Sequence, residues 1–447
     1  MKTKYDVVII GFGKAGKTLA AKLAKLGKSV ALIEKDAKMY GGTCINVGCI
    51  PSKRLITDAA NSPKGEFSAK AEYYKNTIEE KKKLTAALRK ANYDKLAQAG
   101  VDVVDGAASF TDENHITVLT ADGEFIIEGD KFIIGTGSVP VIPKIDGVEN
   151  SQHVYVSETI MDLEELPHSL TIVGGGYIGL EFAFMYANFG SRVTIIQDGK
   201  EFLAREDEDV AECIKSVLKE KGVQIVTAAN TTKIQNGTLY YECDGESKVL
   251  ESDAILLATG RRPNTDGLGC EKAGIILNER GAIETDEHLR TGVKHIWAAG
   301  DVRGKLQFTY ISLDDSRIIL DDMIGNSIRT TNNRGAFSYS VFIEPPFARV
   351  GMNEKEAKAA NVEYRAVSLP TNAIPKAKVL RETDGILKAL IASDGTILGA
   401  ELFCAESPEM INLIKLAMDN KIKAEVIRDF IFTHPTMSES LNDLFSL

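Results

Sequence analysis

Cys44 and Cys49 are the residues of this sequence with the clearest capacity for chemistry. Four residues separate them and a Gly-Gly pair precedes them, which predicts a tight turn and two thiols able to form a disulfide at the start of a helix. Pro51 suits the first turn of that helix. The helix dipole and the nearby positive charge of Lys53 would stabilise a thiolate there. The segment therefore predicts a redox-active pair.

Other roles for cysteine explain this segment less well. Zinc usually takes four soft ligands, and the other cysteines show no paired spacing that would complete such a site. We expect ordinary structural roles for these four, which are Cys213, Cys243, Cys270 and Cys404. The N-terminus lacks the pattern of a signal peptide, so we expect a cytoplasmic location. Structural disulfides are rare in that compartment, which favours a catalytic or metal-binding role for Cys44 and Cys49.

Residues 7–34 have the pattern of a strand, a glycine-rich turn, a helix and a second strand. In such a unit Gly11 permits the tight turn, Gly13 lets the backbone approach a pyrophosphate, and Gly16 lets the helix pack on the strand. The phosphates would lie at the positive end of the helix dipole. Glu34 ends the second strand, where a carboxylate accepts both ribose hydroxyls of an adenosine. The unit predicts a dinucleotide-binding site.

The same pattern recurs in residues 170–197, so the two units form an internal repeat. Its turn contains Gly174, Gly176 and Gly179, and its second strand ends at Gln197 instead of an acidic residue. A glutamine can hydrogen-bond a ribose, but it neither requires the 2′-hydroxyl nor repels a 2′-phosphate. The sequence predicts two nucleotide-binding domains, and it leaves open whether the second takes NADH or NADPH.

Length and composition limit the classes of protein that need to be considered. A chain of 447 residues is expected to form two or three domains, and 44% apolar with 26% charged residues is typical of a soluble globular protein. The net charge of −10 argues against a surface that binds nucleic acid or an anionic membrane. The most apolar stretch, residues 170–189, contains Glu181 and several glycines, which favours strand, turn and helix over a membrane span.

The remaining segments supply the expected boundaries. Residues 68–98 predict a charged, solvated helix, and Pro140, Pro143 and Gly147 mark a linker into the second unit. Arg262-Pro263-Asn264 marks the return to the first unit. From residue 332 onward, strands alternate with helical segments, which predicts a third domain of the α+β class, with strands at 339–342, 387–391 and 397–401.

The cysteine segment, residues 41–53, resembles that of the pyridine nucleotide-disulfide oxidoreductases, which include glutathione reductase, lipoamide dehydrogenase and mercuric reductase. Residues 133–137 and 257–260 resemble the two Ala-Thr-Gly-type strands of this family, with Gly135 in place of the usual alanine. Residues 298–301 resemble its second FAD motif, in which Asp301 would bind the ribityl chain. Residues 434–439 resemble its C-terminal His…Glu pair. The resemblance extends along the whole chain.

The resemblance implies an α/β protein with two Rossmann-like nucleotide-binding domains and a C-terminal α+β dimerisation domain. FAD would bind to residues 1–145 and 265–331, NADH or NADPH to residues 146–264, and residues 332–447 would form a homodimer. The implied FAD contacts are Gly11, Gly13, Gly16, Glu34, Lys35, Gly42, Thr43, Lys53, Thr136, Gly137 and Asp301. The implied contacts to NAD(P)H are Gly174, Gly176, Tyr177, Gly179, Gln197 and Gly260.

The resemblance also implies roles for the reactive side chains. Cys49 would lie next to the flavin, and Cys44 would meet the substrate. Lys53 and Glu181 would form an ion pair beside the flavin, and the nicotinamide would displace Tyr177. His434 would act as acid and base in the site of the partner subunit, with Glu439 orienting its ring, so an active site would require a dimer.

Several classes of electron acceptor are compatible with these residues. Residues 306–315 and 437–445 are similar to one branch of the family, which confers resistance to reactive chlorine and reduces copper(II). We therefore expect the acceptor to be a soft metal ion such as Cu(II) or Hg(II), bound transiently by Cys44 and Cys49. Because thiolates favour Cu(I), they would assist the reduction of Cu(II). Phe308 and Tyr310 would narrow the access for larger acceptors. The alternatives are a small disulfide of the glutathione or lipoamide type, oxygen with release of peroxide, and a flavin-bound copper or redox sensor without turnover.

Overall fold

The first predicted unit lies in a five-stranded parallel sheet with the strand order β19-β8-β2-β3-β4. In this computed structural model, which describes residues 2–447, the unit consists of β2 (Val7–Ile10), α1 (Lys14–Lys25) and β3 (Val30–Glu34). Every residue of β2 is buried, because helices or a second sheet cover both faces. The other strands are β4 (Asp102–Asp105), β8 (Phe132–Ile134) and β19 (Ile296–Ala298).

The second predicted unit forms another five-stranded parallel sheet, with the order β10-β17-β11-β12-β13. Its helix α6 (Tyr177–Phe189) is apolar on most of its surface and ends at Gly190, which has the left-handed conformation expected of a helix cap. The repeat predicted from the sequence is thus present. The strands of this sheet are β10 (Val154–Val156), β11 (Ser169–Val173), β12 (Arg192–Ile196), β13 (Gln224–Val226) and β17 (Ala254–Leu257).

The chain passes between the two parallel sheets along two paired strands. Strand β9 (Ser138–Pro140) and strand β18 (Arg261–Pro263) are antiparallel, and Pro140 lies opposite Arg261. Two smaller sheets, which the sequence patterns did not predict, cover one face of each parallel sheet. They contain β1 (Lys4–Tyr5), β5 (Ala107–Phe110), β6 (His115–Thr120) and β7 (Gly123–Gly129), and β14 (Ala229–Gln235), β15 (Thr238–Cys243) and β16 (Glu246–Glu251). The first is antiparallel except that β1 pairs with β7 in parallel, and the second is wholly antiparallel.

The C-terminal part is an antiparallel sheet with the order β20-β21-β24-β23-β22 and helices packed on it, as an α+β reading predicts. Its strands are β20 (Ser338–Val341), β21 (Phe347–Gly351), β22 (Arg365–Pro370), β23 (Ile386–Ile391) and β24 (Ile397–Phe403). Its helices are α9 (Glu354–Ala359), α10 (Pro375–Leu380), α11 (Ser407–Asp419), α12 (Ala424–Arg428) and α13 (Ser440–Ser446).

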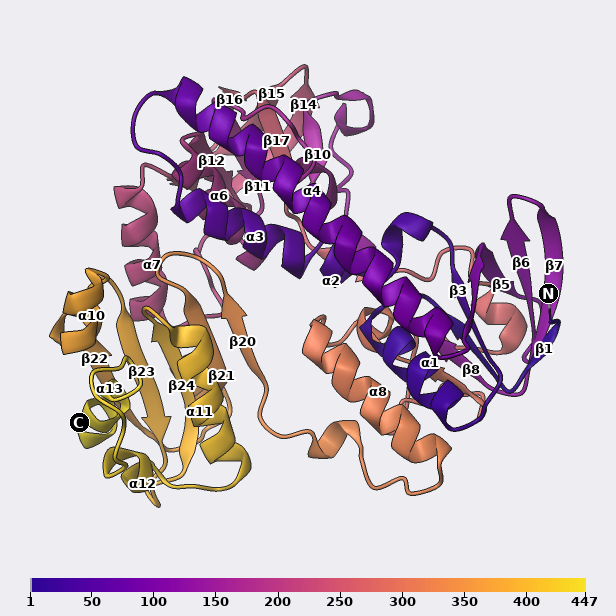
Figure 1. The fold of residues 1–447 in the computed structure, drawn as a ribbon. Helices are drawn as coiled ribbons and strands as arrows, with labels where there is room; N and C mark the ends of the chain where they lie inside the picture. Colours follow the sequence, from indigo (N-terminus) through magenta and orange to yellow (C-terminus); the bar gives the residue numbers. More distant parts are fainter. Residues whose placement is uncertain (1) are drawn as a thin grey trace.

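The charged helix predicted at residues 68–98 is α4 (Phe67–Gln98), and it runs from the second parallel sheet to the first (Figure 1). It is more than a solvated surface helix. Tyr74 and Ile78 pack into the core of the second sheet, whereas Leu96 packs into the core of the first. The Tyr74 hydroxyl donates a hydrogen bond to the carbonyl of Leu163 (2.9 Å). Helix α4 therefore links the two parallel-sheet units by packing into both of their cores.

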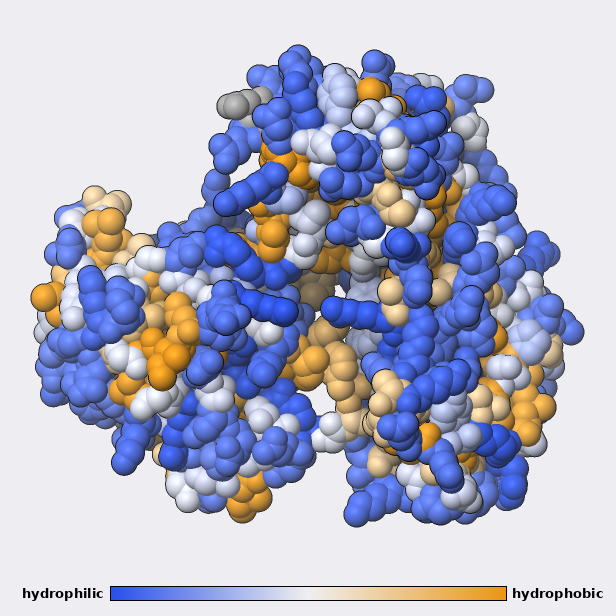
Figure 2. Space-filling model, turned by 180° about the vertical axis from the view of Figure 1, so that it is seen from behind, coloured by the Kyte–Doolittle hydropathy of each residue, from blue (hydrophilic) through white to orange (hydrophobic). Residues whose placement is uncertain are grey.

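The three parts surround a cleft, and the space-filling view shows the molecule hollowed between its lobes (Figure 2). Helices α2 (Thr43–Asn46), α3 (Cys49–Ala60) and α8 (Thr309–Met323) border this cleft, and α5 (Ser157–Ile160) and α7 (Glu208–Glu220) complete the second unit. Over residues 2–447, none of the helices combines the length and the apolar character that crossing a membrane requires.

Candidate active site

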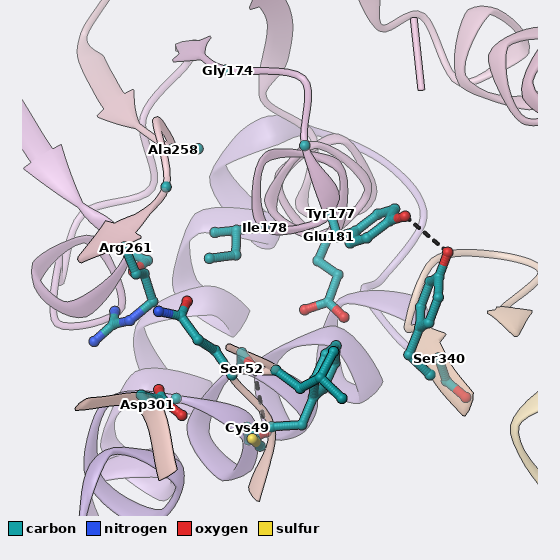
Figure 3. A pocket seen from close by; sticks show the side chains of 18 of the residues that line it. Cys49, Ser52, Gly174, Tyr177, Ile178, Glu181, Ala258, Arg261, Asp301 and Ser340 are labelled. Atoms are coloured by element: carbon teal, nitrogen blue, oxygen red, sulfur yellow. Dashed lines mark hydrogen bonds between the residues drawn. The ribbon is translucent and has the colours of Figure 1, made fainter. Parts of the chain in front are cut away.

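The cleft gathers side chains that are far apart in the sequence. Its walls include the cysteine segment from α2 and α3, the glycine turns before α1 and α6, Asp301, and the start of α8. Figure 3 shows Cys49, Gly174 and Asp301 around this space. Most residues singled out for chemistry in the sequence therefore border one space. His434 and Glu439 do not line it; they lie at and just before the start of α13 in the C-terminal part.

Cys44 and Cys49 lie at one end of this cleft, on the short helix α2 and at the first position of α3. In the described chain both are free thiols, with Cys44 half-buried and Cys49 exposed. Gly48 is the N-cap residue of α3, so Cys49 sits at the positive end of that helix dipole. The Cys49 sulfur lies 3.6 Å from the hydroxyl of Thr309, the first residue of α8. No sequence pattern marked Thr309 as a site residue, because only the fold brings it next to Cys49.

The two thiols differ in acidity. A hydrogen bond from the Cys44 thiol lowers the pKa of Cys49 to about 6, and the Thr309 hydroxyl and the charge of Lys53 act in the same direction against the effect of burial. The same hydrogen bond, together with burial, raises the pKa of Cys44 well above its ordinary value. In the reduced pair, Cys49 is therefore the thiolate and Cys44 the thiol.

We expect the Cys49 thiolate to form with a midpoint at about pH 6 in the reduced protein. Below that pH, Cys49 is protonated, and above it the thiolate persists while Cys44 keeps its proton. The difference in ultraviolet thiolate absorbance between the reduced wild-type protein and Cys49→Ser measures this, because the flavin contribution cancels. A midpoint near the ordinary thiol value of 9.0 would contradict the assignment.

Lys53 and Glu181 form the predicted ion pair between α3 and α6, at 2.6 Å. Glu181 also accepts a hydrogen bond from the backbone N–H of Phe342 (3.0 Å), and the Lys53 ammonium lies 4.8 Å from the centre of the Phe342 ring. Both charges border the cleft and only 12% of the Glu181 side chain is exposed, so the pair is partly desolvated and fixed in place.

The glycines of the two turns fall into two groups. A Cβ at Gly11 or Gly16 would lie 2.3 Å from a backbone oxygen, and one at Gly179 would lie 2.1 Å from the carbonyl oxygen of Gly174, so the packing of the protein itself requires these glycines. By contrast, Gly13 and Gly176 have ordinary extended backbone, and a Cβ there would meet nothing closer than 3.5 Å.

The open space in front of Gly13 and Gly176 fits a phosphate group that lies directly against the backbone. Each of the two residues is the N-cap of a long helix, α1 and α6, so the backbone N–H groups and the helix dipole point into that space. The residues present therefore suit a dinucleotide at each turn, which is the arrangement that FAD and NAD(P)H require.

Other predicted cofactor contacts surround the first turn. Glu34 accepts a hydrogen bond from the Phe12 N–H (2.9 Å), and burial raises the pKa of its carboxyl. Asp301 accepts one from the Ser138 hydroxyl (2.8 Å) in the cleft, and burial raises its pKa too. Gly42 packs on the Gly13 turn, where a Cβ would lie 2.6 Å from the Gly13 Cα. The remaining residues of this group lie nearby at strand and helix ends: Lys35, Thr43, Thr136 and Gly137.

Gln197 is occupied by its own loop. Its side-chain N–H₂ donates to the carbonyls of Gly199 (3.0 Å) and Glu201 (2.9 Å). A Cβ at Gly175 would lie 2.1 Å from the Gln197 amide oxygen, so that oxygen faces the glycine turn. An acidic residue could not make the two donations, which gives a structural reason for glutamine at this position. Gly260 borders the same end of the cleft.

His434 and Glu439 form the predicted pair, with 2.7 Å between the ring Nδ1 and the carboxylate. The His434 side chain is 74% exposed, so it stands free on the surface of the C-terminal part. The carboxylate fixes the orientation of the ring, and the other ring nitrogen, Nε2, remains available to a group from outside this subunit. Within one subunit this histidine does not approach Cys44.

Two family models match the chain. The model of the pyridine nucleotide-disulphide oxidoreductases matches residues 5–316, and that of their dimerisation domain matches residues 337–445. The chain is 47% identical over 446 residues to the probable pyridine nucleotide-disulfide oxidoreductase RclA of Escherichia coli K12, covering 99% of each. It is 34% identical to the dihydrolipoyl dehydrogenase of Geobacillus stearothermophilus (97% and 94% covered) and 32% identical to the mercuric reductase of Staphylococcus aureus (98% and 81% covered).

Solved structures agree with these matches. The Cu(II) complex of the HOCl-induced flavoprotein disulfide reductase RclA from Escherichia coli superposes with a TM-score of 0.94 at 46% identity, covering 100% of this chain and 99% of that one. The similarity to a reactive-chlorine branch, predicted from residues 306–315 and 437–445, is thereby confirmed, and so is the α/β fold with a C-terminal dimerisation domain.

Proposed function

The chain belongs to the pyridine nucleotide-disulfide oxidoreductase family, and we propose that it reduces Cu(II) or another soft metal ion at Cys44 and Cys49 with electrons from NAD(P)H, in defence against reactive chlorine. One observation carries this proposal. The thiol pair lies at the head of α3, beside Thr309 and Lys53, in the cleft that the two glycine turns also line. Members of the family depend on FAD and take electrons from NAD(P)H, which fits the space at both turns.

Bound FAD would supply the two-electron relay from the nicotinamide to the disulfide. The chain's own residues would do the rest. Residues 1–145 and 265–331 would hold the flavin nucleotide, and residues 146–264 the nicotinamide nucleotide. Lys53 and Glu181 would place a fixed charge pair between α3 and α6. In the reduced pair, Cys49 would be the sulfur that is present as the thiolate. Cys44, the protonated partner, would be the thiol that meets the acceptor.

A metal ion would enter as substrate and leave as product. Two thiolates bind a soft ion, and thiolate ligands favour Cu(I) over Cu(II). Two Cu(II) ions would each take one electron, the two sulfurs would lose two electrons and join as a disulfide, and the thiol proton would be released. Among residues 2–447, no three His, Cys, Asp or Glu side chains gather into a metal site, and the proposal places the ion only at the two sulfurs.

Aromatic rings border the cleft beside Thr309. Phe308 packs against Tyr310 and Phe337, with ring centres 5.4 and 5.3 Å apart, and the Tyr310 hydroxyl donates to the carbonyl of Ser338. The rings of Phe308 and Tyr310 both line the cleft, and they flank Thr309, the residue that contacts the Cys49 sulfur, so they would limit the size of an acceptor there and favour a small one over a bulky disulfide.

A homodimer would complete the site. The dimerisation-domain match covers residues 337–445, and His434 with Glu439 lies within it, exposed and oriented. We propose that His434 of one subunit reaches the thiol pair of the other, where it would accept and return the thiol proton.

Steady-state rates with Cu(II), Hg(II), glutathione disulfide, lipoamide and oxygen, each with NADH and NADPH, test the proposal. We expect Cu(II) to give the highest kcat/KM among the five acceptors. A higher value with lipoamide or glutathione disulfide would instead identify a disulfide reductase, and faster peroxide formation would identify an oxidase. A yellow protein that NADH reduces but that turns over no acceptor would identify a sensor.

A further inference from the structure

Asp315, on α8, is a fully buried aspartate whose carboxylate is held by three partners. Its Oδ2 accepts a hydrogen bond from the backbone N–H of Gly300 at 2.8 Å and another from the Arg303 guanidinium at 3.4 Å. Its Oδ1 accepts a hydrogen bond from the Arg334 guanidinium at 2.7 Å. All three partners lie outside α8, so this carboxylate joins segments that the helix alone would not connect.

The two arginines balance the buried charge. The Arg303 side chain is 8% exposed, and its Nε donates a hydrogen bond to the Thr285 hydroxyl at 3.0 Å. Arg334 lies between α8 and β20, and its Nε is 3.3 Å from the Asp314 carboxylate. A carboxylate that has lost its contact with water is costly unless charged donors satisfy it, and here they do. The Asp315 carboxylate is therefore fixed in place.

Gly300 is the point at which this carboxylate reaches the cleft. Gly300 directly precedes Asp301, and both line the cleft, whereas Asp315 lies behind them and does not line it. The φ of Gly300 is +74°, and a Cβ there would lie 2.6 Å from the Ser312 hydroxyl oxygen, so α8 packs directly on this turn. A backbone N–H that donates to a carboxylate forms a stronger hydrogen bond than one that donates to a neutral group.

The position of the Asp301 side chain depends on this turn. The Asp301 carboxylate accepts a hydrogen bond from the Ser138 hydroxyl of β9 at 2.8 Å, which holds its far end. The Gly300–Asp315 hydrogen bond holds the backbone next to it. Residues that contact a ligand bind it more tightly when the protein fixes them beforehand, because less freedom is lost on binding.

We propose that Asp315 is a positioning residue for the flavin, because its hydrogen bond to Gly300 fixes the turn that presents Asp301 to the ribityl chain. The inference rests on the proposed function, since it takes the cleft to bind FAD with Asp301 as one contact. Without the charged acceptor, the Gly300 turn would be free to adopt other conformations, and FAD would have to order it on binding. From the strength of a hydrogen bond to a charged group, we expect an effect of about tenfold on flavin binding.

The test measures how fast the purified holoprotein releases FAD, as the rise of free-flavin fluorescence after dilution. Asp315→Asn keeps the size of the side chain but removes its charge, and we expect FAD to leave about tenfold faster. Arg334→Met leaves Asp315 bonded to Gly300 and Arg303, and we expect a smaller increase, about threefold. Because Arg334→Met removes only one of the three contacts, it also provides the measurement if Asp315→Asn does not fold.

Asp322→Asn and Arg290→Met are the matched controls. Asp322 lies about two helical turns further along α8, and its side chain is fully buried. Arg290 donates two hydrogen bonds to it, each at 2.7 Å, and neither residue lines the cleft. We expect both controls to lose thermal stability, as the test variants do, but to release FAD at the wild-type rate.

A spectroscopic measurement separates positioning of the flavin from stability of the fold. Asp301 would hold the ribityl chain, and the flavin ring beyond it would lie next to Cys49. Charge transfer from the Cys49 thiolate to the flavin requires close contact, and it gives a long-wavelength absorbance in the reduced protein. In NADH-reduced Asp315→Asn, compared with wild type at equal flavin content, we expect a loss of this absorbance.

Wild-type release rates in both Asp315→Asn and Arg334→Met, or an undiminished charge-transfer absorbance in Asp315→Asn, would overturn the role of Asp315 while leaving the proposed function intact. Equal acceleration in Asp322→Asn would also overturn it, because loosening α8 at any position would then be sufficient. If the wild-type protein retained no flavin when FAD was supplied, the proposed function would fall as well.

Discussion

Replacing Cys49 with serine is expected to reduce acceptor turnover by about a thousandfold or more, because no disulfide can then form and no thiolate remains at the head of α3. Cys44→Ser should cause a loss of the same order, since it removes the other half of the bond. Steady-state reduction of Cu(II) with NADH measures both. Retention of flavin colour should be unaffected, because serine is close to cysteine in size.

Cys213→Ser is the matched control for both variants. Cys213 lies on α7, half-buried, outside the cleft, and burial raises the pKa of its thiol. We expect wild-type turnover from this variant. Undiminished Cu(II) reduction in Cys44→Ser or Cys49→Ser would show that electrons leave the flavin by another route, and the proposed role of the pair would be wrong.

Alanine at Gly13 and at Gly176 is expected to distinguish the two proposed nucleotide sites. Neither position needs glycine for the protein's own packing, so Gly13→Ala and Gly176→Ala should fold with wild-type thermal stability when no nucleotide is bound. Gly13→Ala should bind flavin ten- to hundredfold more weakly, because the added methyl occupies the space of the pyrophosphate. Gly176→Ala should keep its flavin but show a similar rise in KM for NADH.

Each of these variants serves as the control of the other, with flavin content and KM as the two measurements. Gly11→Ala provides a contrast, because its Cβ would lie 2.3 Å from the Gly135 carbonyl oxygen and should destabilise the fold itself. Full flavin retention in Gly13→Ala would argue that the pyrophosphate lies elsewhere.

Features encoded in a short stretch of sequence could be predicted. The glycine turn before α1 follows from the spacing of Gly11, Gly13 and Gly16, and the cysteine pair at α2 and α3 is equally local. Contacts between distant segments left no such pattern. Thr309 approaches Cys49 across 260 positions of the chain, and a threonine at the start of a helix is too common to attract notice.

The hydrogen bond from the Tyr177 hydroxyl to the Glu206 carboxylate and the packing of α4 escaped prediction for the same reason. Glu206 sits in an acidic stretch that is typical of a solvated surface, and only the fold buries it against Arg349. The charges of α4 suggested a solvated helix, whereas its few apolar residues reach two different cores. The proposed meeting of His434 with the thiols depends on a second subunit, which no pattern within one chain can place.

The pairing of β9 with β18 has an evolutionary consequence. Pro140 and Arg261 lie side by side on paired strands. The two ends of the segment formed by residues 141–260 are therefore only one strand spacing apart. A segment whose two ends meet can be exchanged, lengthened or lost without stretching its host. We therefore expect that the segment proposed to bind the nicotinamide nucleotide can be replaced as a unit while the thiol pair stays in place.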